Sequence, residues 1–145
     1  MRTACFSLAL ATLMAPSVLA QATPEGLDGF VTLDRLPVPD VAALAAGRAV
    51  WGDTCQNCHG GNKLTGAPKI TSTEVWAPRI DQGLDVLFDH AINGFIGPKY
   101  AEMPARGGNA DLSDAEVEAA VAFMIWASGG DSPALAWAET QIPKE

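Results

Sequence analysis

Three residues that can attach a cofactor or bind a metal lie close together in the chain: Cys55, Cys58 and His59, in the run Cys55-Gln56-Asn57-Cys58-His59. Two thiols at this spacing can each add to one vinyl group of the same porphyrin, and the imidazole that follows then reaches the iron. This is the spacing of c-type haem attachment. The run therefore predicts one covalent haem c on Cys55 and Cys58, with His59 as an axial iron ligand.

Three other interpretations compete for the same run. A thioredoxin-like redox pair needs a parallel sheet around it, and the sequence predicts none. A zinc site needs two further ligands, and only His90 and carboxylates remain to supply them. The third is a chance match, but the five-residue signature is specific in an exported chain. Haem attachment is the favoured interpretation.

The second axial position of the iron has three candidate ligands: His90, Met103 and Met124. Met124 lies on the apolar stripe of a predicted helix, where its simplest role is in the core. His90 lies in another predicted helix and is interpreted as a surface or hydrogen-bonded histidine. Met103 lies in an irregular stretch and is followed by Pro104, so we expect Met103 to be the ligand. His/Met coordination closes the iron to substrates and suits electron transfer.

The N-terminal segment has the pattern of a secretory signal peptide. Arg2 precedes an apolar run over residues 4–14, and the small residue Ala20 stands at the expected cleavage position. A retained membrane anchor is the weaker alternative, because Pro16 breaks the run short of the ~20 residues that a span needs. We expect residues 1–20 to be removed, leaving a periplasmic protein that is not associated with the membrane.

Composition narrows the function further. The chain of 145 residues carries a net charge of −8, which becomes −9 when Arg2 leaves with the leader. Such an acidic protein is a poor ligand for nucleic acid, which demands a basic surface. Cys5 is also lost, so Cys55 and Cys58 remain and no disulfide framework is possible. Covalent haem would supply the missing crosslink of this small domain.

Helical patterns surround these residues. Apolar residues recur at helical spacing over about 41–53, 82–92 and 113–128, and Ser113 with Glu116 forms a capping box at the last of these. Residues 59–80 and 95–111 are interpreted mostly as loop, and no strand is predicted. The expected organisation is a leader (1–20), an extended arm (21–38), one helical domain (39–128) and a tail (129–145). The tail either wanders or lies back on the domain.

Together these residues resemble the class I c-type cytochromes, and among them the short bacterial cytochromes of the c-five type. The resemblance spans about residues 40–128 and lies in Gly47-x-x-x-Trp51-x-x-x-Cys55, Gly66-Ala67-Pro68, Trp76-Ala77-Pro78-Arg79, His90-Ala91-Ile92-Asn93-Gly94 and Met103-Pro104-Ala105-Arg106-Gly107-Gly108. It implies an all-α class I cytochrome c fold, in which the first and last helices cross at Gly47 around one covalently bound haem.

The resemblance also implies roles for single residues. The carbonyl of Pro68 would accept a hydrogen bond from the second ring nitrogen of His59 and orient the ring. Trp76 and Arg79 would contact the haem propionates. The loop over residues 94–100 looks longer than in that family, so it would reshape the exposed haem edge or form a docking surface.

The expected function is transfer of single electrons between larger redox proteins. The protein would act as a free carrier or as the cytochrome subunit of a dehydrogenase or oxidase, and it would not be an enzyme by itself. Docking would be transient, over a small interface with electrostatic steering. The alternatives are an enzyme or gas-binding haem protein with an open sixth position, and a structural protein without haem.

Overall fold

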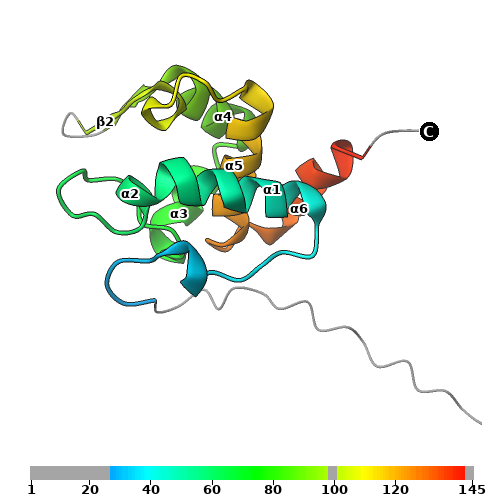
Figure 1. Cartoon of the computed structure of the whole chain (residues 1–145), viewed down its shortest axis with the longest axis horizontal. Coiled ribbons are helices and arrows are strands. Elements are labelled where there is room, and N and C mark those ends of the chain that lie inside the picture. Colours follow the sequence, from blue (N-terminus) through cyan, green and yellow to red (C-terminus); the bar gives the residue numbers. More distant parts are fainter. Residues whose placement is uncertain (1–26, 98–100, 143–145) are drawn as a thin grey trace, which may run out of the picture.

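The computed structural model describes residues 27–97 and 101–142 of the chain (Figure 1). The predicted leader, residues 1–20, lies outside the described residues. The helical elements in chain order are η1 (Leu33–Arg35, 3₁₀), α1 (Ala42–Val50), η2 (Trp51–Cys55, π-helical), α2 (Gln56–His59), α3 (Thr73–Ile80), α4 (Leu84–Asn93), η4 (Ala105–Gly108, 3₁₀), α5 (Asp114–Trp126) and α6 (Asp131–Thr140). Two short strands, β1 (Phe95–Ile96) and β2 (Glu102–Met103), pair antiparallel. None of the described helices is long and apolar enough to cross a membrane.

The core is built on the crossing of α1 and α5, which pack directly on each other (Figure 1). A Cβ atom built on Gly47 of α1 would overlap the backbone carbonyl of Ala119 in α5. The ring of Trp51 meets Phe123 edge-on, with centroids 6.2 Å apart, and both side chains are fully buried. The implied crossing of the first and last helices of an all-α class I cytochrome c domain is present, with Gly47 at the contact.

The start of α5 is the capping box that the sequence predicts. The N–H of Glu116 donates to Ser113 Oγ over 3.3 Å, and the N–H of Ser113 donates to Glu116 Oε2 over 2.8 Å. Hydrogen bonds from the Ser113 hydroxyl and backbone lower the pKa of the Glu116 carboxyl. Each bond satisfies a backbone donor at the helix end that has no intrahelical partner. The cap therefore fixes where α5 begins.

Three elements differ from the sequence expectation. Residues 59–80 are mostly loop, as predicted, but the unpredicted helix α3 occupies Thr73–Ile80, with the buried Trp76 and with Pro78 inside it. The expectation of no strand is wrong, since β1 and β2, of two residues each, form a hairpin in which Phe95 pairs with Met103. An eight-residue helix with an internal proline shows no clear periodicity, and two residues are too few to show alternation.

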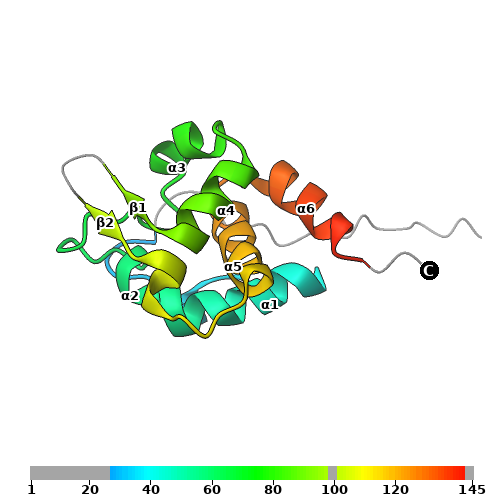
Figure 2. The same cartoon turned by 90° about the horizontal axis from the view of Figure 1, so that it is seen from above.

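The C-terminal segment lies back on the domain as α6 (Figure 2). Ala134 and Ala138 are buried, and α6 packs against α5. The ring of Trp137 meets Phe88 of α4 edge-on, with centroids 6.0 Å apart. Of the two expectations for the tail, wandering or docked, the docked one describes residues 131–140.

Candidate haem site

The Cys-x-x-Cys-His run lies at the end of one continuous helical stretch formed by α1, η2 and α2. The π-helical turn η2 ends at Cys55, and α2 carries Cys58 and His59. Such π turns are rare and often occur at functional sites. Both thiols are free and half-buried. Residues three apart share a helix face, as attachment of both sulfur atoms to one ligand requires; of the two cysteines, Cys55 lines the pocket described below.

The alternative chemistries for this run lack their partners. Burial raises the pKa of the Cys55 thiol to about 11, and the neighbouring Cys58 adds to the rise. Catalytic dithiols have lowered thiol pKa values, so Cys55 lacks that property. Among the described residues, no three His, Cys, Asp or Glu side chains come together as a zinc site would require.

His59 is buried and held by the backbone of the loop that follows it. Its Nδ1 lies 2.8 Å from the carbonyl oxygen of Pro68, the contact implied by the resemblance. Because a carbonyl only accepts, Nδ1 carries the proton and the lone pair of the ring is on Nε2. Burial lowers the pKa of His59 and the charge of Arg79 acts the same way, against the opposing hydrogen bond to Pro68. The imidazole is thus a neutral ligand with Nε2 free.

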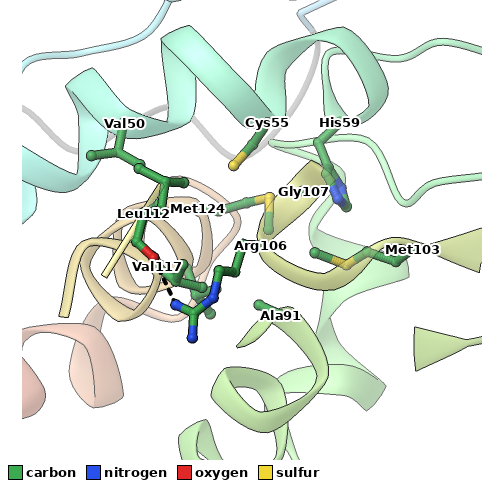
Figure 3. A pocket seen from close by; sticks show the side chains of 12 residues that line it. Val50, Cys55, His59, Ala91, Met103, Arg106, Gly107, Leu112, Val117 and Met124 are labelled. Carbon is green, nitrogen blue, oxygen red and sulfur yellow. Dashed lines mark hydrogen bonds between the residues drawn. The ribbon is translucent and has the colours of Figure 1, made fainter. Parts of the chain in front are cut away.

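A pocket opens beside these residues, and its walls are apolar on almost every side (Figure 3). It is lined by Val50, Cys55, His59, Ala91, Met103, Arg106, Gly107, Leu112, Val117, Ala120, Val121 and Met124. Figure 3 shows Cys55, His59 and Met103 turned into the same space from different segments. An apolar macrocycle with a central iron suits such a lining of aliphatic side chains, one thiol, one imidazole and two thioethers. The donor set therefore fits haem.

The three candidates for the second axial position lie in different places. Met103 of β2 lines the pocket and is half-buried. Met124 of α5 is buried in the core, as predicted, but it lines the same pocket, which the periodicity of α5 did not reveal. His90 of α4 is not among the lining residues, and its ring stacks on Phe95 with centroids 4.0 Å apart. The pocket brings together His59 and the two methionines.

Trp76 and Arg79 lie near His59 but do not line the pocket. The ring of Trp76 is 6.2 Å from the His59 ring, and its indole N–H donates to the carbonyl of Lys69 over 2.9 Å. Arg79 is half-buried and donates from Nη1 to the carbonyl of Val75. The indole donor therefore already has a partner in the protein, and contacts of Trp76 and Arg79 with haem propionates stay predictions.

Arg106 is a charged pocket residue for which the sequence predicted no role. It belongs to the motif of residues 103–108 that resembles the family, and its side chain lines the pocket together with Met103 and Gly107. Its backbone has a positive φ of 54°. A non-glycine residue in this region is uncommon, and nothing in local composition announces it.

An all-α domain whose first and last helices cross beside an apolar pocket, with Cys-x-x-Cys-His in its wall, defines a class I c-type cytochrome. The family model described as cytochrome c oxidase, cbb3-type, subunit III matches residues 42–124. Cytochrome c-555 of Chlorobaculum tepidum is 47% identical over 81 residues, which cover 56% of this chain and 73% of that protein. Cytochrome c5 of Ectopseudomonas mendocina is 40% identical over 90 residues, covering 57% and 97% of the two chains.

A solved electron transfer complex of nitrite reductase with cytochrome c contains a similar chain. The similarity has a TM-score of 0.50 and 36% identity, over 57% of this chain and 94% of the other. The chain belongs to the cytochrome c family, close to the c5 type. It is an electron carrier with covalently bound haem c, and Cys55 and Cys58 have the spacing that holds this group.

Proposed function

We propose that this cytochrome transfers single electrons between larger redox proteins in the periplasm, with His59 and Met103 as the axial ligands of its iron. The observation that carries the proposal is the pocket in which a neutral His59 and the Met103 thioether share apolar walls. Bound haem supplies an iron that cycles between its ferric and ferrous states. The chain would hold the group on Cys55 and Cys58, and it orients the buried His59 through Pro68.

Of the two methionines that line the pocket, Met103 is the better candidate for the second axial ligand. Met124 comes from α5, which packs on the helical stretch that carries Cys55, so it shares a wall with the attachment site. Met103 comes from β2 of the hairpin, an element separate from the helical stretch that carries His59, and so can approach the pocket from another side. A methionine in this position fills the sixth coordination site and raises the reduction potential. This favours electron transfer over an open-site enzyme or a gas-binding protein.

The surface next to the pocket offers a docking area for a redox partner. Leu64 is 96% exposed in the loop after His59, and Ile96 and Phe95 on β1 are 70% and 41% exposed. The hairpin and this loop lie side by side (Figures 1 and 2), and a Cβ built on Gly66 would lie 3.5 Å from the Cβ of Ala101. Exposed apolar groups at one edge favour transient association. The relative crystallised with nitrite reductase supports a redox enzyme as the partner.

Periplasmic location follows from the signal-peptide pattern of residues 1–20, which lie outside the described residues. Cys55 and Cys58 form no disulfide with each other and are therefore available for haem attachment, which suits an exported protein. We therefore propose that the mature protein acts there, as a free carrier or as a subunit of a dehydrogenase or oxidase.

The test compares Met103→Ala with Met124→Leu in the exported holoprotein. The oxidised wild type should show the near-infrared band of a methionine–iron bond. We expect Met103→Ala to lose this band and to lower the reduction potential, whereas Met124→Leu, which keeps the volume of the core, retains the band. Loss of the band in Met124→Leu alone would transfer the role to Met124. A wild type without the band would contradict His/Met coordination.

A further inference from the structure

We propose that Arg106 is a positioning residue that ties the Met103 segment to the start of α5 and so keeps the Met103 thioether at the pocket. This inference rests on the proposed role of Met103 as ligand. It assigns the retention of that ligand to one side chain that is neither in the attachment motif nor a ligand.

The backbone of Arg106 adopts a conformation that its side chain does not favour. Its φ and ψ are 54° and 27°, and Gly107 follows with φ 64°. Glycine is the residue that normally occupies this left-handed region, and arginine is rarely found there. A residue kept in such a conformation points to a requirement for its side chain.

The guanidinium of Arg106 meets that requirement by bridging to the next element. Its Nη1 donates to the carbonyl oxygen of Leu112 over 2.8 Å, drawn as a dashed line in Figure 3. Its Nη2 donates to Asp114 Oδ1 over 2.6 Å, and the two side chains are 26% and 64% exposed. Asp114 is the first residue of α5. The bond to the Leu112 carbonyl is part-buried, whereas the ion pair with Asp114 is exposed and is therefore partly screened by solvent.

The Met103 segment has few other attachments. Among the described residues from 102 to 108, Arg106 alone makes side-chain hydrogen bonds. The backbone of Met103 is held by a strand pair of two residues. Close packing holds the ends of the segment: a Cβ built on Gly94 would lie 3.1 Å from Ala105 N, and one on Gly107 would lie 3.0 Å from Thr54 Cγ2. These contacts join the segment to the end of α4 and to η2, whereas the side chain of Arg106 joins it to α5.

Arg106 therefore links a weakly paired hairpin to a helix that is anchored in the core. Since α5 crosses α1 and α1 leads into the Cys-x-x-Cys-His run, the link connects the Met103 side of the pocket to the His59 side. Without it, the segment would open more often and leave the sixth position to a competing ligand.

The experiment measures that opening with imidazole as the probe, titrated into the oxidised full-length holoprotein and followed by the visible spectrum. Imidazole binds the iron only in the fraction of molecules whose methionine has left, so its apparent affinity reports that fraction. We expect Arg106→Ala to raise imidazole affinity about tenfold, the equivalent of losing one strong polar contact. Asp114→Asn should have a smaller effect in the same direction.

Four comparisons make the test specific. Glu118→Gln removes the same charge one turn further along α5 and should leave imidazole affinity unchanged. Arg106→Gly removes the bridge and also relieves the backbone strain. It should raise imidazole affinity as much as Arg106→Ala does, but it should unfold at a higher denaturant concentration than Arg106→Ala. The double variant of Arg106→Ala and Asp114→Asn should match Arg106→Ala, because both act through one contact. The methionine–iron band of every variant without imidazole confirms that the ligand is present.

Two results would overturn the proposal in distinguishable ways. If the wild type has the methionine–iron band and Arg106→Ala lowers the unfolding midpoint without changing imidazole affinity, Arg106 is structural only. If the wild type lacks the band, the ligand assignment of the proposed function is wrong and this proposal is wrong with it.

Discussion

At the scale of single residues, the surroundings of His59 explain how the chain orients the imidazole that we propose as an axial ligand. The hydrogen bond to Pro68 selects the tautomer, and burial favours the neutral ring. The carbonyl of His59 also accepts from the N–H of Ile70, so the loop is bonded to both the ring and the backbone of the same residue. The ligand is oriented by its own following loop, over a short stretch of chain.

The indole of Trp76, close to His59, donates to the carbonyl of Lys69, and this bond can be tested separately from any contact with the haem. In Trp76→Phe the Lys69 carbonyl would lose the indole N–H as a donor and keep the bond from the Ser72 N–H at 3.3 Å, while most of the ring volume remains. We expect the free energy of unfolding to fall by about 1 kcal/mol, the usual net contribution of one hydrogen bond. The reduction potential should not change, because no donor to the cofactor is removed. Chemical denaturation and redox titration measure the two quantities.

The matched control is Trp137→Phe in α6, whose indole N–H donates to none of the described residues. It should lower stability less than Trp76→Phe. A shift of the potential in Trp76→Phe without a loss of stability would instead favour the propionate contact that the family resemblance implies.

At the scale of elements, the site depends on how closely α1 approaches α5. The overlap expected for a Cβ on Gly47 is with a backbone carbonyl, which cannot move aside as a flexible side chain would. The helices are therefore separated by less than ordinary side chains permit. Because α1 continues through η2 to Cys55 and α5 carries pocket residues, the same approach sets the width of the pocket.

Gly47→Ala should consequently be among the most damaging single-methyl substitutions in the chain. We expect it to reduce the free energy of unfolding by about 3 kcal/mol, the upper part of the range for overpacking, although alanine is the better helix former. Guanidinium denaturation measures this value. Ala46→Ser, at the adjacent exposed position of α1, should change stability by less than about 0.5 kcal/mol. Equal stability of Gly47→Ala and wild type would show that α1 and α5 can separate freely.

At the scale of the whole molecule, the cofactor completes the core. The pocket walls come from the helical stretch α1, η2 and α2, from α4 and α5, and from the segment around Met103, so an apolar group bound there would add contacts to those that α5 already makes with α1 and α4. The described residues include no disulfide, and both described cysteines have the spacing for haem. A domain of this size often needs a crosslink or a ligand to be stable.

Removing the covalent haem should therefore loosen the whole domain. We expect a variant with Cys55→Ala and Cys58→Ala to lose near-ultraviolet circular dichroism and to bind the dye ANS, while part of its helical far-ultraviolet signal remains. Cys5→Ala, in the predicted leader, is the control and should give wild-type holoprotein. A double variant with native near-ultraviolet dichroism and no dye binding would show that the core is complete without haem.

Local patterns predicted those parts of the fold that depend on neighbours in sequence. The capping box of Ser113 and Glu116 is confirmed, and the helices predicted near residues 41–53 and 82–92 are present within about two residues at most ends. Elements whose stability comes from distant contacts were missed. Trp76 in α3 and Ala134 in α6 are buried by other elements, and neither short segment shows a period that reveals this.

The sequence by itself determined the chemistry of attachment, because the spacing of Cys55, Cys58 and His59 is set along a single turn of helix. The resemblance to class I cytochromes added Pro68, whose bond to His59 is present, and Met103, whose role as a ligand stays a proposal. Only the tertiary structure decided which side chains share the pocket. Met124 and Met103 line it together, whereas His90 stacks on Phe95 outside it. The tertiary structure also pairs Arg106 with Asp114. Those choices depend on how helices pack across long stretches of chain, which no local pattern records.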